Sequence, residues 1–484
     1  MFSKKVDWII ISVSYIFVNF LYFYTGGKFH FDHIKYFWQF LDVRYLKNDL
    51  LRGVFYLHSQ PPLFNFITGV LIKNPFLKPQ TFAMILFLIL GYFSLILFYK
   101  IMVMLDIDNK LSLFFSLIFF FNPSFLMFET FYFYTLPVIF LLILSLYFLI
   151  RYFKEKNIRH FTLFLFSLLV LSLIRSIFHL LFFLMLFFIF FYLKKEERRK
   201  VYKRIAIVTF ILLLFYLKNF ILFDTFSLSS WFGMNFAKVF SFYMDKKEKK
   251  KLLTGNLEDV FYIIPPFSFP KMYPQRYLAI PEKYRNIPEL SKSYKRIGDV
   301  FISNYNYYPY IRISKIYLKK YLKALEVVPM SYMRGVLKSF EFYLIPAYHI
   351  YLIKKDSTFL KRLIFTFNYL LLRFWNSEDK KKYTLSEKKL AFYTKFAFYP
   401  LFAIFVLLTF PLFIFNLRVE RTFWKRIVYI FIFFTIIYVM YVGMFFECGE
   451  NNRFRFTTHA YYLIVWAIFI KNLNSILKSV SKKN

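Results

Sequence analysis

The stretch FYFYTLPVIFLLILSLYFLI, residues 131–150, contains no charged side chain. A helix of about twenty apolar residues is long enough to cross the roughly 30 Å hydrocarbon core of a bilayer. Residues 81–99, TFAMILFLILGYFSLILFY, form a second run of this kind. Because such runs recur along the chain, the sequence predicts an all-α, polytopic membrane protein.

The composition of the whole chain agrees with this prediction. Hydrophobic residues make up 59% of the chain and aromatic residues 25%, a higher apolar content than that of ordinary soluble domains. The 65 Lys and Arg outnumber the 27 Asp and Glu. Many of the cations cluster between apolar runs, at 151–159, 194–204 and 418–426. This pattern follows the positive-inside rule and favours membrane lipid, not nucleic acid, as the partner.

These basic clusters also predict which side of the membrane each segment faces. Lys4 and Lys5 place the amino terminus inside, before a helix at 8–24 that lacks a small-residue cleavage site and is expected to be retained. Regular alternation then gives about ten crossings in the plasma or inner membrane, with both termini cytoplasmic. The expected crossings are 8–24, 81–104, 111–121, 131–150, two within 161–193, 203–222, 394–417, 427–446 and 456–471.

Residues 61–77 do not fit this alternation, because both residue 60 and residue 80 should face outside. We expect a helix that lies on the outer face or dips into it; the alternative is a true span with one basic anchor misassigned. Three parts are predicted: an N-terminal membrane module, a polar extracytoplasmic and interfacial region, and C-terminal membrane helices. Their ranges are 1–222, with the first outer loop at 25–60, then 223–390, partly helical around 300–328, and 391–484.

The polar side chains that could act on a substrate fall on the predicted outer side. Asp32 follows the first helix and could take a proton from an acceptor hydroxyl as a general base, or it could be an ordinary solvated acid. His58 and Gln60 precede the rigid pair Pro61-Pro62. They could orient a sugar or a phosphate, or they could belong to a helix start.

Three further candidates lie later in the chain. Glu129 could bind a metal or an acceptor, or it could stabilise the amino end of the next helix. Arg175 lies at the tip of an apolar helical hairpin, where its planar fork would suit phosphate and where it could equally reach lipid headgroups. Arg453 and Arg455, in the loop ENNRFRF, could hold a phosphate leaving group. Their positive charge on the outside runs against the positive-inside trend, which favours this role over a solvated loop.

The order of these features resembles the GT-C superfamily of integral membrane glycosyltransferases, in the branch of protein mannosyltransferases and aminoarabinose transferases. An Asp follows the first helix, and then come His-Ser-Gln-Pro-Pro-Leu, an Asn-Pro with a later acid, and a mid-chain Arg. An acid–Asn–Asn–Arg–Phe–Arg–Phe loop follows near the end. The resemblance covers about 8–222 and 394–471.

The resemblance implies an inverting transfer of a sugar from a polyprenyl-phosphate donor on the outer face, with Asp32 as the base. Arg453 and Arg455 would hold the lipid phosphate, and His58 and Gln60 would shape the sugar or acceptor site. Many relatives have a second acid directly after this Asp, where the chain has His33. Use of a divalent metal therefore stays open, and the acceptor could be lipid-linked, a glycan or a protein.

Two other functions stay open from the sequence. A polymerase or ligase of surface polysaccharide would use related chemistry with a saccharide–lipid donor. A lipid or sugar transporter would favour inverted repeats and helices broken near the membrane midplane. The sequence shows no repeat, and its polar groups lie at the predicted outer edge, which argues against transport.

Overall fold

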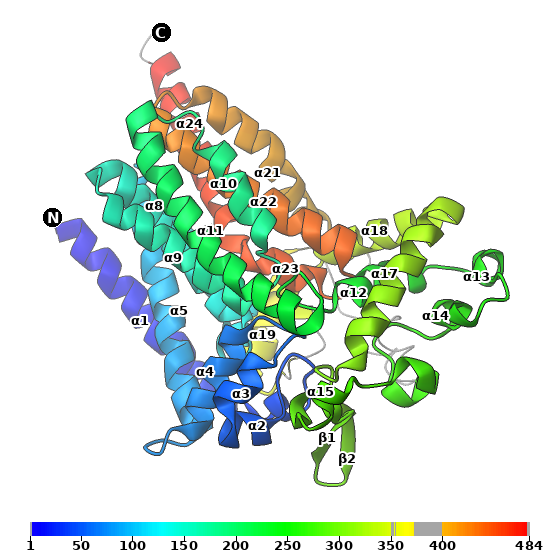
Figure 1. Cartoon of the computed structure of the whole chain (residues 1–484). Helices are drawn as coiled ribbons and strands as arrows, with labels where there is room; N and C mark the ends of the chain where they lie inside the picture. The colour runs from blue at the N-terminus through cyan, green and yellow to red at the C-terminus, as the bar shows by residue number, and fades with distance from the viewer. Residues whose placement is uncertain (1, 350–352, 354, 372–398, 482–484) are drawn as a thin grey trace.

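The computed structural model describes residues 2–349, 353, 355–371 and 399–481. Apart from one hairpin, the described residues form helices and the loops between them. A bundle of long helices occupies one part of the molecule, and a region of short helices and the hairpin lies beside one end of it (Figure 1). We call residues 224–349 the polar region.

Seven described helices are long and apolar enough to cross a membrane. Their apolar runs contain few charges, so each can satisfy its backbone groups internally in lipid. The protein therefore has the character of a multi-pass membrane protein. The seven helices are α1 (Phe2–Tyr24), α5 (Pro79–Met104), α8 (Thr135–Glu155), α11 (Lys195–Phe223), α21 (Pro400–Val419), α22 (Phe423–Phe446) and α24 (His459–Ser481).

The count of ten crossings is not confirmed. Helices α6 (Asn109–Phe121) and α7 (Pro123–Glu129) qualify only as a pair bent by 61°, which would make an eighth span. The bend occurs where Asn122 caps α7 and Pro123 interrupts the backbone hydrogen bonds. Helices α9 (Ile158–Ile174) and α10 (Leu180–Ile189) are shorter, with 17 and 10 residues. At 1.5 Å per residue, α10 is about 15 Å long, half of the hydrocarbon core.

The predicted first outer loop is built from short helices. These are η1 (Asp32–Lys35), α2 (Val43–Asn48), α3 (Leu50–Phe55) and α4 (Pro62–Lys73). Helix α4 covers most of the segment 61–77 and begins at a proline, which suits the first turn of a helix. Its 12 residues give a length of about 18 Å, less than a crossing requires.

The polar region follows α11, which ends at Phe223. Strands β1 (Tyr294–Ile297) and β2 (Val300–Ser303) pair antiparallel, with Tyr294 opposite Ser303. The helix expected around 300–328 begins only at Pro309, because the hairpin occupies the preceding residues. The other elements are α12 (Phe232–Ser241), α13 (Lys246–Leu252), η2 (Leu257–Asp259), α14 (Val260–Ile263), η3 (Pro270–Met272), η4 (Gln275–Tyr277), α15 (Glu282–Arg285), α16 (Pro288–Ser291), α17 (Pro309–Val327), α18 (Pro329–Tyr343) and η5 (Ala347–His349).

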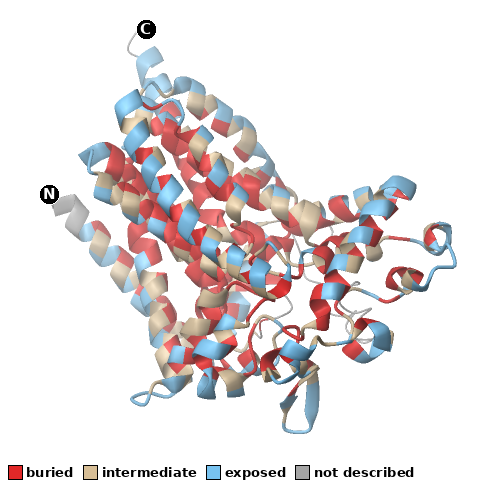
Figure 2. Cartoon of the chain, viewed as in Figure 1, coloured by how far each residue is buried: buried red, intermediate tan, exposed pale blue. Residues whose placement is uncertain are grey.

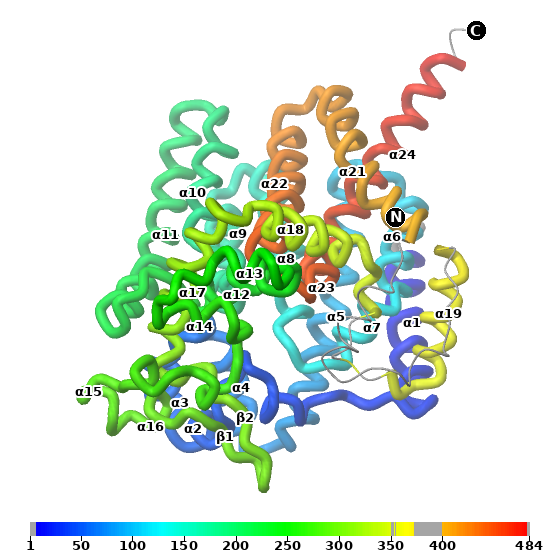
Figure 3. Tube along the Cα trace, turned by 90° about the vertical axis from the view of Figure 1, so that its right-hand side faces the viewer, coloured from blue at the N-terminus to red at the C-terminus, as the bar shows by residue number. Residues whose placement is uncertain are grey.

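The chain then returns to the bundle. Helix α19 (Thr358–Leu370) lies beside α1 (Figure 3), and the hydroxyls of Thr25 and Ser357 are 2.7 Å apart. The rest of the predicted region 223–390, and the start of the predicted span 394–417, lie outside the described residues. A last short helix, α23 (Asn451–Thr457), connects α22 to α24.

The core runs through the middle of the bundle, where buried residues predominate (Figure 2). Helix α8 is the most enclosed span, with 72% of its apolar window buried against other helices. Helix α11 instead exposes large apolar side chains such as Phe210 and Ile221. A helix that is apolar on its outside suits contact with lipid, so α8 is central and α11 peripheral.

Candidate functional site

A cavity of about 580 Å³ lies between the bundle and the polar region. Segments distant in sequence form its walls: the first loop, the α9–α10 turn, helix α12 and the α22–α23 turn. Concave sites of this size between parts of a protein are common ligand sites. The lining residues are Tyr36, Phe37, Trp38, Gln39, Gln60, Arg175, Ser176, Ser229, Trp231, Asn235, Lys238, Phe242, Tyr243, Pro266, Phe267, Phe342, Glu447, Cys448, Gly449, Glu450 and Arg453.

Two arginines predicted from the sequence meet at one end of this cavity. The Cζ of Arg175 lies 4.4 Å from the centroid of the Tyr134 ring, and the Cζ of Arg453 lies 5.2 Å from it. Both guanidinium groups donate hydrogen bonds to the Tyr134 hydroxyl. Glu450 pairs with Arg453, whereas Arg175 forms no ion pair with another described residue. The pair of cations therefore exceeds its local counter-charge.

Arg453 has unused hydrogen-bonding capacity. The residue is only 2% exposed, and its Nε and Nη1 atoms have no hydrogen-bond partner among the described residues. A buried N–H group without a partner costs free energy, and a charged one costs more. An anion bound at this end of the cavity would supply the missing acceptors and the missing charge.

A third cation lies on the wall formed by the polar region, and a second carboxylate faces it from the end of α22. Lys238 of α12 donates a 2.7 Å hydrogen bond to Glu447, at the end of α22. Burial alone would lower the pKa of Lys238, but the charge and hydrogen bond of Glu447 raise that pKa above its ordinary value. Lys238 therefore stays protonated, and the pair connects α12 to the end of a candidate span.

Aromatic rings and free amides line the rest of the cavity. The rings of Trp38 and Phe267 are stacked with centroids 5.5 Å apart, and Trp231 meets Phe267 edge to face at 5.4 Å. The side-chain amides of Gln60 and Asn235 form no hydrogen bond with another described residue. Flat aromatic faces next to free amides can hold a molecule that has both apolar faces and hydroxyl groups.

His58 lies outside this lining and has a structural environment. Its Nδ1 lies 2.8 Å from the Ser230 hydroxyl, and its Nε2 lies 3.0 Å from the Asn306 carbonyl oxygen. The side chain is 1% exposed, and burial lowers its pKa to about 3. His58 thus joins the first loop to the polar region as a neutral imidazole, and Gln60, two residues later, faces the cavity.

Arg455 also lies outside the lining. Residues two apart on a helix point about 200° away from each other, and α23 places both arginines on its short turn. Arg455 donates to the carbonyl oxygens of Tyr343 and Ile345, at 2.9 and 3.4 Å, and its guanidinium lies over Phe402. The structure therefore separates the two arginines that the sequence suggested as one clamp.

Glu129 is enclosed within the bundle. It is fully buried and accepts a 2.5 Å hydrogen bond from Tyr15. A Cβ atom at Gly91 would lie 1.8 Å from its Oε1, so Gly91 makes room for this carboxyl group. Glu129 is not among the residues that line the cavity, and its hydrogen bond is to Tyr15 of α1.

Asp32 begins η1, four positions before Tyr36, and is not among the residues that line the cavity. Its side chain is 82% exposed and lies 3.2 Å from Lys35. Its neighbour His33 stacks on Phe131 with centroids 3.9 Å apart, and burial lowers the pKa of His33 to about 4. The carboxylates that line the cavity itself are Glu447 and Glu450.

Metal ligands are not grouped in the residues that the structure describes. No three or more His, Cys, Asp or Glu side chains within them are arranged to hold a metal ion. Lys238, Asn235 and the Glu447 carboxylate were not selected from the sequence as candidates. Asn235 and Lys238 are single polar residues within the apolar stretch 231–240, WFGMNFAKVF, and Glu447 directly follows the apolar helix α22. No motif marks them, and the hydrogen bond between Lys238 and Glu447 joins positions 209 residues apart.

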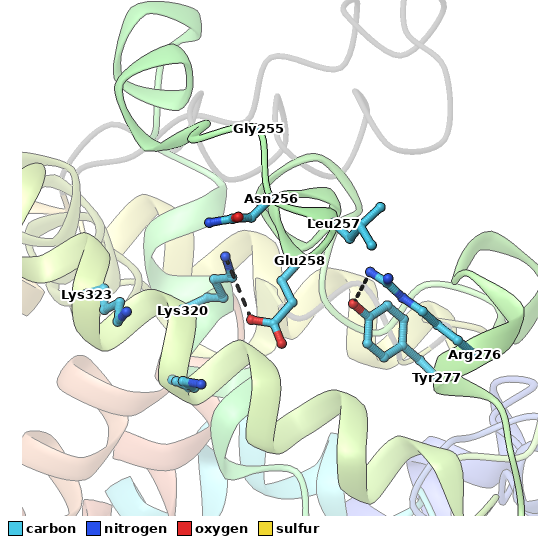
Figure 4. Close-up of a pocket in the computed structure, with 9 residues that line it drawn as sticks. Gly255, Asn256, Leu257, Glu258, Arg276, Tyr277, Lys320 and Lys323 are labelled. Atoms are coloured by element: carbon cyan, nitrogen blue, oxygen red, sulfur yellow. Dashed lines mark hydrogen bonds and ion pairs between the residues drawn. The ribbon is translucent and has the colours of Figure 1, made fainter.

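A second hollow of about 620 Å³ lies on the polar region alone (Figure 4). It is lined on one side by Lys319, Lys320 and Lys323 of α17. Lys320 is largely compensated, since its Nζ lies 3.1 Å from Asp259 and 3.8 Å from Glu258. This hollow contains none of the residues that the sequence predicted for chemistry, so the cavity beside the bundle is the stronger candidate site.

No protein-family model, curated protein or solved structure matches the chain.

Proposed function

We propose that the protein is a membrane glycosyltransferase, which moves a sugar from a polyprenyl-phosphate donor to an acceptor hydroxyl at the outer face. The observation that carries this proposal is the buried guanidinium of Arg453, which lies beside a second arginine and has two nitrogen atoms without a hydrogen-bond partner among the described residues. The planar fork of arginine matches the oxygens of a phosphate. The lipid phosphate of the donor would satisfy Arg453 and neutralise Arg175 together.

The position of the cavity supports a lipid-linked donor. Arg175 follows the apolar helix α9, and Arg453 follows the candidate span α22. A polyprenyl chain could thus stay among apolar helices while its phosphate reaches the two arginines. The sugar would then occupy the part of the cavity that contains Trp38, Trp231 and the free amide of Gln60.

The proposed reaction is a single inverting displacement. The acceptor hydroxyl gives its proton to a carboxylate, and its oxygen forms a bond with the anomeric carbon as the bond from that carbon to the phosphate oxygen breaks. The leaving polyprenyl phosphate gains one negative charge. Arg453 and Arg175 stabilise that charge most strongly in the transition state, which lowers the barrier.

Asp32 is the proposed general base. Its carboxylate is exposed and lies four positions before Tyr36, the first residue of this loop that lines the cavity, so it can meet an acceptor that enters from the aqueous side. Glu450 is engaged by Arg453, and Glu447 accepts from Lys238. Both of these ion pairs are largely buried, whereas the pair of Asp32 with Lys35 is exposed to solvent, so Glu450 and Glu447 are the weaker bases. Transfer should be measured with and without divalent ions, because use of a metal in this step stays open.

The test measures transfer of radiolabelled sugar from polyprenyl-phosphate donors in membranes that contain the full chain. Asp32→Asn is compared with Asp299→Asn, a matched control at an exposed carboxylate in the β1–β2 turn. Loss of a general base should lower the rate by about 10²- to 10⁴-fold, while the control keeps wild-type activity. Loss of activity in Glu450→Gln with full activity in Asp32→Asn would move the base to Glu450.

Arg453→Ala and Arg453→Lys test the phosphate site in the same assay. Removing one charge-stabilising donor should lower kcat by about 10²- to 10³-fold, and lysine should restore only part of it because it lacks the planar fork. Unchanged transfer by Arg453→Ala would refute the proposed site. Absence of transfer by the wild type with every donor sugar, with and without divalent ions, would refute the proposed function.

A further inference from the structure

Helix α18 exposes an apolar stripe on the surface of the polar region. Met330, Met333 and Leu337 are 63%, 45% and 58% exposed. Their spacing of three and four residues places them on one face of the helix. Three large apolar side chains in a row on a helix indicate a surface that is covered by something apolar.

The opposite face of α18 is fixed against the protein. Ser331, Gly335 and Ser339 are buried. A Cβ atom at Gly335 would lie 2.0 Å from the carbonyl oxygen of Val239, so α18 and α12 are in close backbone contact. The helix cannot rotate to bury its stripe, and the stripe faces away from the polar region.

The stripe begins beside the end of a candidate span. Tyr332 donates a 2.9 Å hydrogen bond to the carbonyl oxygen of Phe445, one residue before α22 ends. Ser339 donates a 3.0 Å hydrogen bond to the carbonyl oxygen of Glu447. In Figure 1, α18 lies beside the end of α22 and extends away from the bundle. Met333 therefore lies next to a residue that is bonded to the last turn of a candidate span.

A dense group of cations flanks the stripe. Arg334 follows Met333 and pairs with Glu248 of α13, which holds α13 beside α18; the two helices are neighbours in Figure 3. Helix α13 has the sequence KKEKKKL. None of its five lysines, Lys246, Lys247, Lys249, Lys250 and Lys251, forms an ion pair with another described residue.

We propose that α18 and α13 together form a membrane-contact surface, in which the stripe enters the lipid interface beside α22 and the lysines bind anionic phospholipid headgroups. An apolar helix face with lysines beside it is the pattern of helices that lie in the interface plane, and clustered lysines attract anionic lipid. Lipid is favoured over a protein partner because the surface is continuous with the end of a span.

This contact has a consequence for the cavity. Phe342 of α18 and Lys238 of α12 both line it, and α12 is held against α18 at Gly335. Lipid bound to the membrane-contact surface therefore holds one cavity wall in place. The composition of the surrounding leaflet thereby affects how well that wall is ordered.

The experiment uses the full chain in lipid nanodiscs with an environment-sensitive fluorophore on single introduced cysteines. Met333→Cys reports on the stripe, and Val300→Cys is the matched control, because Val300 is 54% exposed on the hairpin. The native Cys448 is 1% exposed, and the wild type measures its background labelling. Phosphatidylcholine with a nitroxide on its acyl chain should quench the label at Met333→Cys several-fold more than the label at Val300→Cys. Equal quenching at the two positions would overturn the lipid contact.

The charge component has its own comparison. Adding phosphatidylglycerol should increase quenching of the Met333→Cys label, and the increase should disappear when Lys246, Lys247, Lys250 and Lys251 are changed to Gln. These lysines are on the surface, so the variant should keep the wild-type melting temperature. An unchanged response to phosphatidylglycerol in that variant would overturn the role of α13.

Discussion

Arg175 and Arg453 place their guanidinium groups against the same ring, that of Tyr134, from segments 278 positions apart in the chain. Each guanidinium carbon lies within about 6 Å of the ring centroid, the distance at which cation–π attraction is significant. The ring and its hydroxyl hold two like charges close together, and Glu450 pairs with one of them, Arg453. Such an arrangement is stable only because aromatic faces and Glu450 offset part of the repulsion, and it leaves the site ready for a negatively charged group.

A first prediction concerns ligand-induced stabilisation at this site. Polyprenyl phosphate should raise the melting temperature of the wild type in detergent, because binding to the folded state alone stabilises it by about 2.7 kcal/mol at a hundredfold excess over Kd. Arg453→Gln should lose this increase and show little change in melting temperature without ligand, since the substitution also relieves repulsion with Arg175. An equal increase in the wild type and in Arg453→Gln would contradict the assignment.

Arg455 should behave in the opposite way. Arg455→Met removes hydrogen bonds from a charged group to two carbonyl oxygens, each worth about 1.5–3 kcal/mol. We expect a lower melting temperature and nearly normal ligand-induced stabilisation. Thermal unfolding with and without polyprenyl phosphate checks this, and a variant that loses the ligand response while keeping its stability would place Arg455 in the binding site.

The ion pair between Lys238 and Glu447 should connect the polar region to the bundle. Lys238→Met, Glu447→Gln and the double variant form a double-mutant cycle that isolates their interaction. Hydrogen bonds to charged groups contribute about 1.5–3 kcal/mol. We expect a coupling toward the lower end of this range, because both side chains are partly exposed. Additive effects of the two single substitutions would show that the pair contributes no stability.

Stability should fall in mild acid because of His58. Its pKa is lowered from 6.5 in the unfolded chain to about 3 in the folded protein, so the unfolded state binds more protons between these values. The contribution of His58 is complete above pH 6.5 and declines as pH decreases, at most by about 1.4 kcal/mol per pH unit. His58→Asn should therefore lose less stability than the wild type between pH 6.5 and pH 4.5. Parallel stability curves for the two proteins would contradict this.

Gly91 should be required for the packing of Glu129. In Gly91→Ala the new methyl group would overlap the carboxylate, and overpacking of this kind costs about 1–3 kcal/mol. Glu129→Ala should remove the overlap, so the double variant should unfold at a higher temperature than expected from the two single changes. A double variant with purely additive losses would show that the close approach at Gly91 does not limit packing.

The sequence located the helices of the bundle better than it located the site. Hydropathy is a local property, so the runs at 81–104 and 131–150 correspond to α5 and α8 within a few residues. The length of a helix near a bend or a chain reversal is harder to predict, since the bend at Pro123 and the shortness of α10 depend on neighbouring helices. The hairpin at 294–303 was not predicted, because its four-residue strands have no long alternating pattern.

Which of the candidate side chains face the cavity could not be predicted from the sequence. Gln60, Arg175 and Arg453 line the cavity, but His58 and Arg455 do not, although each lies two residues from one that does. On a helix such as α23, side chains two residues apart point in nearly opposite directions. In the loop at His58, a hydrogen bond to Asn306 fixes the orientation of the imidazole. Neither the helix phase nor a contact across 248 positions can be obtained from spacing alone.

The hydrogen bonds of His58 also constrain the order in which parts of the protein can fold during synthesis. Its partners Ser230 and Asn306 follow it by 172 and 248 positions. At synthesis rates of about 5–20 residues per second, Asn306 is made roughly 12–50 s after His58. During that time the first outer loop cannot form its hydrogen bonds to the polar region, although the helices on either side of the loop have already left the ribosome. The newly made chain therefore passes through a stage in which this loop is open to chaperones and proteases, and the stage ends only when the polar region has been translated.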